Sequence, residues 1–255
     1  MKPLIEVDNL NFSYGKTNVL REFTLKVNAG DIMCLMGRNG CGKTTLIDCI
    51  LGFNHVDSSI KILGQELNSL SRIEIAKKIS YVQQIALNDS MLEVYDYLLL
   101  GRIVHKKIYE SVNETDVEIV EKVTKELGID EWLQKNVNQL SGGEKQLVMI
   151  ARALIQDTPI IIMDEPTSAL DFGNQSIFLS LIKRLQESGK TVIFTTHNPN
   201  HALAIDASVC LIDNGRCIKS GKARECLDEE TLHKVYGKGI NFIRDNNVLA
   251  CTFSV

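Results

Sequence analysis

The chain has 255 residues, of which 44% are hydrophobic, and this is enough for one large α/β domain with an ordinary globular core. Its formal net charge of -4 gives no bulk attraction to nucleic acid, and no apolar run approaches the ~20 residues of a membrane-spanning helix. The N-terminus lacks the apolar centre of a signal peptide, so we expect a cytosolic protein that binds no nucleic acid, unless a partner holds it at a membrane. The seven cysteines are odd in number and have no Cys-x-x-Cys spacing, which disfavours a disulfide framework or a structural zinc site.

The N-terminal residues alternate between polar and apolar side chains, as half-buried strands do. We expect short strands at residues 4–7, 11–15 and 23–27, with a turn at residues 28–31. Residues 59–64 could add another strand. The sequence therefore predicts an antiparallel sheet in this part of the chain.

Residues 36–45 are the stretch around which the chain is organised. Gly37 is followed five residues later by Gly42, Lys43 and Thr44, between an apolar run and a helix-like run, which is the P-loop pattern. Glycines let the backbone wrap a polyphosphate with its N–H groups pointing inward, and the following helix presents its positive dipole end to the same anion. Lys43 is placed as a mobile charge for the β- and γ-phosphates, and the Thr44 hydroxyl is a hard oxygen ligand that suits Mg²⁺. The expected nucleotide-binding residues of this loop are Gly37, Asn39, Gly40, Cys41, Gly42, Lys43, Thr44 and Thr45.

One residue of this loop, Cys41, carries a reactive group. Because Cys41 lies close to Lys43 and to a helix N-terminus, we expect its thiol to have a lowered pKa and to be sensitive to alkylation unless the bound nucleotide shields it. The alternative is an inert small residue.

The middle of the chain changes to a helical pattern. Residues 73–78 predict a short helix, and residues 79–84 predict a strand that ends in two amides. From residue 91 to residue 140 apolar side chains recur at helical spacing, and Gly128 marks the expected end of one helix.

An α/β alternation follows. Residues 159–163 are an uninterrupted apolar run, as expected of a central parallel strand covered on both faces. An amphipathic helix at residues 177–185 and a second buried strand at residues 191–196 complete a βαβ unit, and residues 209–218 predict a hairpin. The sequence therefore predicts a single domain over residues 1–255, with an α/β core at about 1–84 and 157–255 and a helical subdomain at about 85–156.

Two carboxylates, Asp164 and Glu165, follow the apolar run at residues 159–163. An open α/β sheet binds its ligands outside the carboxyl ends of its strands, so Asp164 suits a Mg²⁺ shell and Glu165 is placed to polarise an attacking water as a general base. A pair of acids at a strand end is often only a solvated turn. The P-loop earlier in the chain favours the functional interpretation.

A pair of glycines opens another predicted helix. Ser141 is a candidate N-cap and Glu144 stands three residues on, as in a capping box, while Gly142 and Gly143 permit the close approach of a ligand. An ordinary helix start explains the serine and the glutamate. It does not explain two glycines that weaken the first turn.

Five motifs stand in a fixed order along the chain, at residues 37–45, 140–146, 160–165, 168–171 and 196–197. In this order and spacing they resemble the Walker A, signature, Walker B, D-loop and H-loop motifs of the ATP-binding cassette (ABC) ATPases, and the resemblance spans nearly the whole chain. It implies a P-loop (RecA-like) α/β core with an N-terminal antiparallel β-subdomain and an inserted α-helical subdomain. It also implies hydrolysis of ATP with Mg²⁺.

The resemblance implies roles for single residues. Tyr14 resembles the aromatic residue that stacks on adenine, although an aromatic residue on a strand often belongs to the core. Gln84 resembles the Q-loop glutamine that senses Mg²⁺ and the attacking water, with Gln83 as the alternative register, and His197 resembles the switch histidine that contacts the γ-phosphate. The implied catalytic residues are Glu165, His197 and Gln84; the implied metal-binding residues are Thr44, Gln84 and Asp164; and the implied nucleotide-binding residues outside the P-loop are Tyr14, Ser141, Gly142, Gly143 and Asp171.

One chain carries one P-loop and one signature motif. In the family these motifs face each other across a head-to-tail dimer that holds two ATP molecules between its copies. Ser141 and Gly143 would then reach the γ-phosphate of the nucleotide held by the partner copy. The resemblance therefore implies a homodimer.

Two further segments resemble one branch of the family. Residues 91–102 resemble a Val-x-x-x-Val…Gly-Arg stretch of the iron–siderophore, haem and cobalamin importers, and residues 229–237 resemble their Leu…Val-Tyr-Gly segment; helix faces packing on their own core would also explain both. The importer resemblance implies integral-membrane permease subunits bound after Gln84, an indirect substrate-binding protein, and a place at the cytoplasmic face of the cell membrane. The implied cargo is a metal chelate or a related oxyanion such as molybdate.

Other ABC ATPases provide the competing hypotheses. A soluble ATPase of iron–sulfur cluster assembly would bind a scaffold protein in place of a permease. DNA-repair and chromosome-structure ATPases separate their motifs by long coiled coils, whereas roughly a hundred residues lie between Gly37 and Ser141, too few for heptad arrays. Translation-factor cassettes normally carry two P-loops per chain, and this chain has one.

Overall fold

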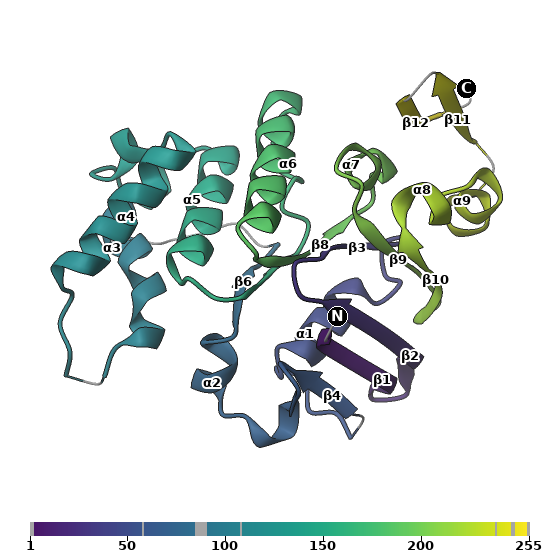
Figure 1. Cartoon of the computed structure of the whole chain (residues 1–255), viewed down its shortest axis with the longest axis horizontal. Helices are drawn as coiled ribbons and strands as arrows, with labels where there is room; N and C mark the ends of the chain where they lie inside the picture. Colours follow the sequence, from purple (N-terminus) through teal and green to yellow (C-terminus); the bar gives the residue numbers. More distant parts are fainter. Residues whose placement is uncertain are drawn as a thin grey trace.

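Two β-sheets and the helices that cover them form the centre of the molecule (Figure 1). The computed structural model describes residues 3–57, 59–84, 91–107, 109–237, 239–245 and 248–253. The larger sheet is built from β3 (Ile32–Met36), β6 (Ile79–Val82), β7 (Ile160–Met163), β8 (Thr191–Thr196), β9 (Ser208–Asp213) and β10 (Arg216–Lys222). Its strand order is β10-β9-β3-β8-β7-β6, and β10 alone among these strands is antiparallel to its neighbour.

The strands in the middle of the larger sheet are buried. Every residue of β3, β7 and β8 is buried, as expected of parallel strands that are covered on both faces. The strands predicted at residues 159–163 and 191–196 are thereby confirmed as β7 and β8. Because these strands are parallel, the segments that follow β3, β7 and β8 all lie at one edge of the sheet.

The smaller sheet is antiparallel, as predicted. It consists of β1 (Pro3–Tyr14), β2 (Thr17–Asn28), β4 (Ser59–Ile62) and β5 (Gln65–Glu66), in the order β2-β1-β4-β5. The prediction of two separate strands at residues 4–7 and 11–15 was wrong. The polar residues between them form an irregularity of the β1–β2 ladder, with Asn9 at a φ of 48°, and a β-bulge absorbs such an interruption without a turn.

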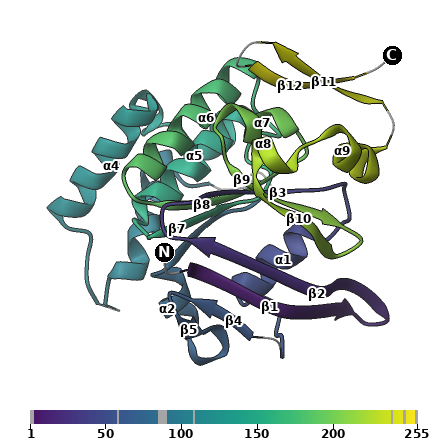
Figure 2. The ribbon, with the colours of Figure 1, turned by 45° about the vertical axis from the view of Figure 1, so that its right-hand side comes forward.

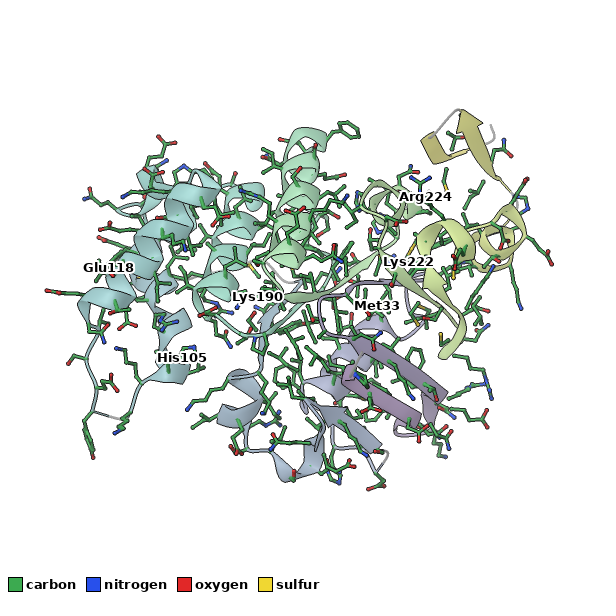
Figure 3. All side chains as sticks on the ribbon, viewed as in Figure 1. Met33, His105, Glu118, Lys190, Lys222 and Arg224 are labelled. Atoms are coloured by element: carbon green, nitrogen blue, oxygen red, sulfur yellow. The ribbon has the colours of Figure 1, made fainter. Side chains whose placement is uncertain are left out.

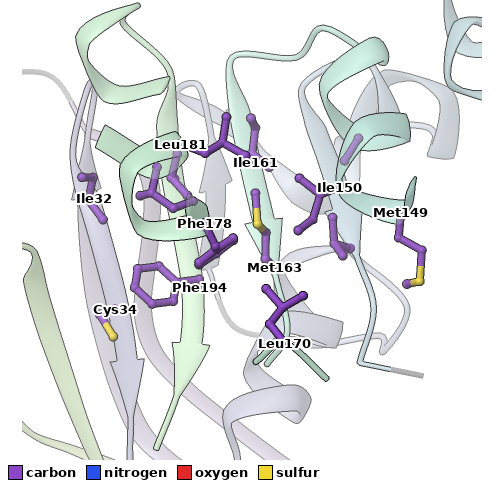
Figure 4. Packing of buried hydrophobic residues seen from close by; sticks show 14 of the residues in the cluster. Ile32, Cys34, Met149, Ile150, Ile161, Met163, Leu170, Phe178, Leu181 and Phe194 are labelled. Carbon is purple, nitrogen blue, oxygen red and sulfur yellow. The ribbon is translucent and has the colours of Figure 1, made fainter. Parts of the chain in front are cut away.

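Helices cover both faces of the larger sheet (Figure 2). The residues of α1 that pack inward share a core with β1, β2 and β3, whereas α5, α6 and α7 cover the opposite face. On that face Phe178 of α6 meets Phe194 of β8 edge to face, with ring centroids 6.0 Å apart, next to Ile161 and Met163 of β7 (Figure 4). The helices are α1 (Lys43–Ile50), α2 (Arg72–Ala76), α3 (Val94–Leu99), α4 (Glu114–Leu127), α5 (Gly142–Ile155), α6 (Phe172–Glu187), α7 (Pro199–Ala204), α8 (Ala223–Cys226) and α9 (Glu229–Tyr236).

The described residues between β6 and β7 are mainly helical. Here α3, α4 and α5 pack together, and Gly128 ends α4 in the left-handed conformation, as predicted. Figure 3 shows Glu118 of α4 pointing away from the molecule, whereas Met33 lies in the interior. Residues 85–90, at the start of the expected helical subdomain, lie outside the described residues. The strand predicted at residues 79–84 ends earlier, at Val82.

A buried ion pair network ties α4 to the segment after α3. The Asp116 side chain is 3% exposed and accepts a hydrogen bond of 3.0 Å from Arg102 Nε, and Lys106 Nζ contacts its other carboxylate oxygen. Arg102 also donates to the Ile155 carbonyl at the end of α5, at 2.9 Å. The network therefore joins three helical segments.

We expect Asp116→Ala to lower the free energy of unfolding by about 3 kcal/mol, because it leaves the largely buried Arg102 without its carboxylate and Lys106 with only Glu110, at 3.6 Å. Glu121→Ala on the same helix is the matched control, since Glu121 forms an exposed pair with Lys125 and its loss costs below about 0.5 kcal/mol. Urea unfolding followed by circular dichroism measures both changes. Equal losses in the two variants would show that the network does not stabilise the fold.

The C-terminal part follows the hairpin predicted at residues 209–218. That hairpin is confirmed as β9 and β10, whose Asn214-Gly215 turn has positive φ at both residues. Beyond it, α8 and α9 lead to a second hairpin, β11 (Ile240–Asp245) and β12 (Val248–Phe253). The Asn200 side chain of α7 donates a hydrogen bond to the Cys251 carbonyl of β12 and accepts one from the Cys251 N–H. Across the ranges described above, no helix has the length and apolar character needed to cross a membrane.

Candidate functional site

The loop between β3 and α1 has the backbone that a phosphate cradle needs. A Cβ on Gly37 would lie 2.3 Å from the Ile212 carbonyl oxygen, and Gly42 combines a φ of 108° with a Cβ position 3.0 Å from Leu20. Larger residues are therefore excluded at both positions. Lys43 is 6% exposed, and its ammonium donates to the carbonyls of Gly37 at 2.9 Å and Arg38 at 3.2 Å. The loop thus holds its own lysine inside the turn.

The predicted cation ligands Thr44 and Asp164 are in contact. Thr44 Oγ1 donates a 2.7 Å hydrogen bond to Asp164 Oδ2, and Thr195 Oγ1 donates one of 2.6 Å to Asp164 Oδ1. Asp164 is fully buried at the end of β7, so these hydroxyls orient its carboxylate toward the start of α1. Thr195 is a residue that the sequence analysis missed, because only the alignment of β7 with β8 brings it next to the carboxylate.

The predicted general base, Glu165, is held in an uncommon backbone conformation. Its φ is 45°, its N–H donates to Thr195 Oγ1 at 2.6 Å, and its carbonyl accepts from Ser168 Oγ at 2.9 Å. Gln84 Nε2 donates to Glu165 Oε2 at 2.9 Å. A non-glycine residue stays in this region only where its surroundings enforce it, which is common at functional sites.

A pocket of about 320 Å³ collects most of the predicted residues. Gln84, and not Gln83, lines it, which favours Gln84 between the two alternatives. Val19 of β2 also lines the pocket and was not predicted, because it belongs to no motif. The lining residues are Val19, Asn39, Gly40, Gly42, Lys43, Thr44, Thr45, Gln84 and Glu165.

His197 lines a different, larger cavity. This cavity has a volume of about 820 Å³ and also includes Arg38, Asn39, Tyr236 and residues of the C-terminal hairpin. Asn39 lines both cavities, so His197 lies next to the P-loop but outside its pocket. Tyr14 is not among the lining residues of either cavity; its ring packs edge to face on Phe12, with centroids 4.9 Å apart.

The signature residues cap α5. Ser141 Oγ accepts from the Glu144 N–H, and Glu144 Oε2 accepts from the Ser141 N–H at 2.7 Å, so the predicted capping box is confirmed. The hydrogen bond from the Ser141 backbone lowers the pKa of Glu144. A Cβ on Gly143 would lie 3.3 Å from the Ala169 carbonyl oxygen, so this glycine permits close packing on the loop at residues 168–171.

The remaining predicted residues lie around this loop. Asp171 ends it as the N-cap of α6, where its carboxylate accepts from the Asn174 N–H at 2.8 Å. The lining of the 320 Å³ pocket includes neither Asp171 nor the signature residues Ser141, Gly142 and Gly143. Within one copy, the structure therefore does not bring these residues together with the P-loop.

The prediction of a low pKa for Cys41 was wrong. Cys41 is 7% exposed, and its burial raises the pKa of the thiol more than the nearby Lys43 charge lowers it.

A different thiol, that of Cys217, has a lowered pKa. Cys210 Sγ donates to Cys217 Sγ at 3.1 Å, and this hydrogen bond lowers the pKa of Cys217 and raises that of Cys210.

We expect Cys217 to be the first of the seven cysteines to be alkylated near neutral pH, because a lower pKa gives more of the reactive thiolate. Peptide mapping by mass spectrometry after a short iodoacetamide treatment identifies the labelled residue. Cys217→Ser should remove the fast phase, and MgATP should not protect it. Early, ATP-protected labelling of Cys41 would refute this expectation.

The donor set fits a magnesium ion bound together with a nucleotide. Thr44, Asp164 and Gln84 supply hydroxyl, carboxylate and amide oxygens, the hard ligands that Mg²⁺ prefers. Across the described ranges no group of three or more His, Cys, Asp and Glu side chains could hold a metal ion alone. This agrees with the way Mg²⁺ is usually bound, through one or two protein oxygens together with phosphates and water.

These features define a class of protein. A phosphate-binding loop between a buried parallel strand and a helix, opposed by two carboxylates at the end of another strand of the sheet, is the site of a P-loop nucleoside triphosphate hydrolase. The model of the ABC transporter family matches residues 20–168, and the chain belongs to this family. It is an ABC transporter ATP-binding protein, which hydrolyses ATP in a reaction coupled to transport.

Known relatives match nearly the whole chain. An uncharacterised ABC transporter ATP-binding protein of Haemophilus influenzae is 39% identical over 236 residues, which is 91% of this chain and 89% of the relative. The molybdate import ATP-binding protein MolC of the same organism is 35% identical over 92% of this chain and 89% of its own length. A solved structure, described as an inward-facing conformation of a metal-chelate type ABC transporter, has a TM-score of 0.85 and 30% identity, and the match covers 100% of this chain and 97% of that one.

Proposed function

We propose that the chain is the ATP-hydrolysing subunit of an importer for a metal chelate, such as an iron–siderophore, haem or cobalamin, or for a related oxyanion. The observation that carries the ATPase part is the pocket in which Lys43, Thr44, Gln84 and Glu165 meet. The likeness to a metal-chelate type transporter and to a molybdate import protein supports the importer part. The segment at residues 91–102 supports it too.

The residues of the pocket divide the chemistry between them. The P-loop N–H groups and Lys43 hold the phosphates, and Thr44, Asp164 and Gln84 would hold the cation. Bound Mg²⁺ would neutralise charge on the phosphate oxygens. Glu165 orients a water molecule for in-line attack and accepts its proton, and the Gln84 amide keeps the Glu165 carboxylate directed into the pocket.

A second copy would complete the site. In this proposal Ser141, Gly142 and Gly143 contact the γ-phosphate of the partner's nucleotide in a head-to-tail homodimer, and Asp171 lies beside them. His197 contacts the γ-phosphate of the chain's own nucleotide and Tyr14 stacks on its adenine. The separation of the signature residues from the P-loop pocket within one copy supports this arrangement.

A permease would hold the chain at the cytoplasmic face of the cell membrane. Large apolar side chains are exposed in the segment after the undescribed residues 85–90, where Met91 is 90% exposed and Ile103 is 59% exposed. Exposed apolar groups of this size are typical of protein interfaces. In the proposal these apolar side chains bind a helix of the permease. A cargo-loaded substrate-binding protein contacts the permease on the opposite side of the membrane.

Reconstitution tests the proposal. The chain is purified together with its permease partner, placed in liposomes, and supplied with binding protein loaded with a ferric chelate, haem, cobalamin or molybdate. We expect one of these cargoes to stimulate phosphate release and to enter the liposomes. Purification with a soluble iron–sulfur scaffold protein, and not with a permease, would favour the alternative of a cluster-assembly ATPase.

A further inference from the structure

A second histidine, His201, is buried four residues after His197. His201 is 6% exposed and lies on α7, which packs beside α6 (Figures 1 and 2). Its Nδ1 is 3.0 Å from Thr196 Oγ1, and its Nε2 is 3.1 Å from Gln175 Oε1 of α6. The proposed chemistry uses neither His201 nor Gln175.

Gln175 extends this contact to the loop at residues 168–171. Gln175 Nε2 donates a 3.0 Å hydrogen bond to the Leu170 carbonyl. The neighbouring Ala169 carbonyl lies against Gly143, in the first turn of α5. A continuous series of contacts thus leads from the start of α5, through the loop at residues 168–171 and Gln175, to His201.

The hydrogen-bond partners determine which ring nitrogen of His201 carries the proton. A carbonyl only accepts, so the Gln175 NH₂ group faces Leu170 and the Gln175 oxygen faces His201. His201 Nε2 therefore donates, and Nδ1 accepts from the Thr196 hydroxyl. In this assignment the amide of Asn198, whose Nδ2 lies 3.3 Å from Nε2, makes only a contact. Burial, and to a lesser extent the nearby His197, lowers the pKa of His201, which agrees with a neutral ring.

The far end of this chain of hydrogen bonds holds both neighbours of His197. Thr196 precedes His197, and its hydroxyl oxygen also accepts from the Asn198 N–H at 3.1 Å. Asn198 follows His197. The backbone on either side of the exposed His197 is therefore held by two residues that contact His201.

We propose that Gln175, His201 and Thr196 are positioning residues that couple the two nucleotide sites of the dimer. They connect the signature turn, which meets the partner's nucleotide, to His197, which meets the chain's own nucleotide. The inference rests on the proposed function. When the partner's nucleotide seats the start of α5, the loop at residues 168–171 and the three side chains bring His197 into its productive position.

Removing single hydrogen bonds tests the coupling. Gln175→Met keeps the length of the side chain and removes its amide, and Thr196→Val keeps the shape and removes the hydroxyl. We expect each variant to lower kcat about tenfold, because a displaced group loses much of its effect, while KM for ATP stays within about twofold. The double variant should be no slower than the slower single variant, since the same connection is broken twice. The Hill coefficient for ATP should fall toward 1 in all three.

Two controls separate coupling from structure. Gln186→Met removes a similar hydrogen bond from the same helix, in which Gln186 Nε2 donates to the Gly30 carbonyl at 3.0 Å, and it should leave kcat unchanged. Thr196→Ser retains the hydroxyl that Thr196→Val removes, and it should therefore keep the parental kcat. In the Glu165→Gln background each variant should still form the ATP-dependent dimer.

Three results would overturn the inference. Parental kcat and Hill coefficient in Gln175→Met would exclude a positioning role, and multiplied losses in the double variant would show two independent effects. If either of these two results is found while the ATP-dependent dimer still forms, the inference fails but the proposed function stands. If the Glu165→Gln chain itself forms no ATP-dependent dimer, the proposed function fails and the inference fails with it.

Discussion

Replacing Glu165 with glutamine is expected to leave ATP binding intact and to slow hydrolysis by about 10²–10⁴-fold, the range for loss of a general base. The glutamine keeps the size of the side chain and an oxygen that can accept from Gln84. The backbone contacts to Thr195 and Ser168, which hold the unusual φ of residue 165, do not involve the side chain that changes. The effect therefore falls on proton transfer and not on folding. The rate of ATP hydrolysis is measured from the release of inorganic phosphate.

The same variant should accumulate as an ATP-bound dimer, because hydrolysis no longer releases the copies from one another. Gel filtration with ATP and Mg²⁺ separates the dimer from single copies. Glu118→Gln is the matched control, since Glu118 is an exposed residue of α4 and its loss of charge should change neither property (Figure 3). Turnover at the parental rate in Glu165→Gln would remove Glu165 from the mechanism.

The parts of the fold that the sequence predicts best are those that depend on local patterns. Residues 191–196 are apolar or β-branched throughout, and a strand buried on both faces requires that composition. The P-loop pattern is equally local in the sequence, although the contacts that exclude a Cβ at Gly37 and Gly42 come from the distant residues Ile212 and Leu20. Parallel pairing then explains why Thr44 and Asp164, 120 residues apart, are in contact.

The errors have physical reasons that are not local. The interruption in β1 is a bulge and not a turn, because β2 and β4 pair with the strand on both sides and hold it extended. The pKa of Cys41 depends on how deeply the thiol is buried, and the sequence shows the neighbouring charge of Lys43 but not the burial. Val19 reaches the pocket, and His201 reaches Gln175, only through packing between distant segments. No motif marks them.

Mixing two inactive variants is expected to restore ATP hydrolysis, because each site is proposed to combine the P-loop of one copy with the signature turn of the other. Lys43→Ala removes the charge that holds the phosphates. Gly142→Asp places a carboxylate where the partner's γ-phosphate is expected; a Cβ at residue 142 has only Ala169 within 4 Å, and an acidic residue in the first turn of α5 favours the helix. Each variant alone should therefore fold and have little activity.

In a mixed dimer both changes fall in one site and the other site is intact. With random pairing half of the dimers are mixed, so the mixture should recover up to about a quarter of the parental turnover, and coupling between the sites would lower this figure. Gly142→Ala, which adds a methyl group but no charge, is the matched control and should retain more activity than Gly142→Asp. Phosphate release is measured over a range of mixing ratios and should be highest at equal amounts. If activity at every ratio is only the weighted mean of the two variants, each copy completes its own site and the shared site is refuted.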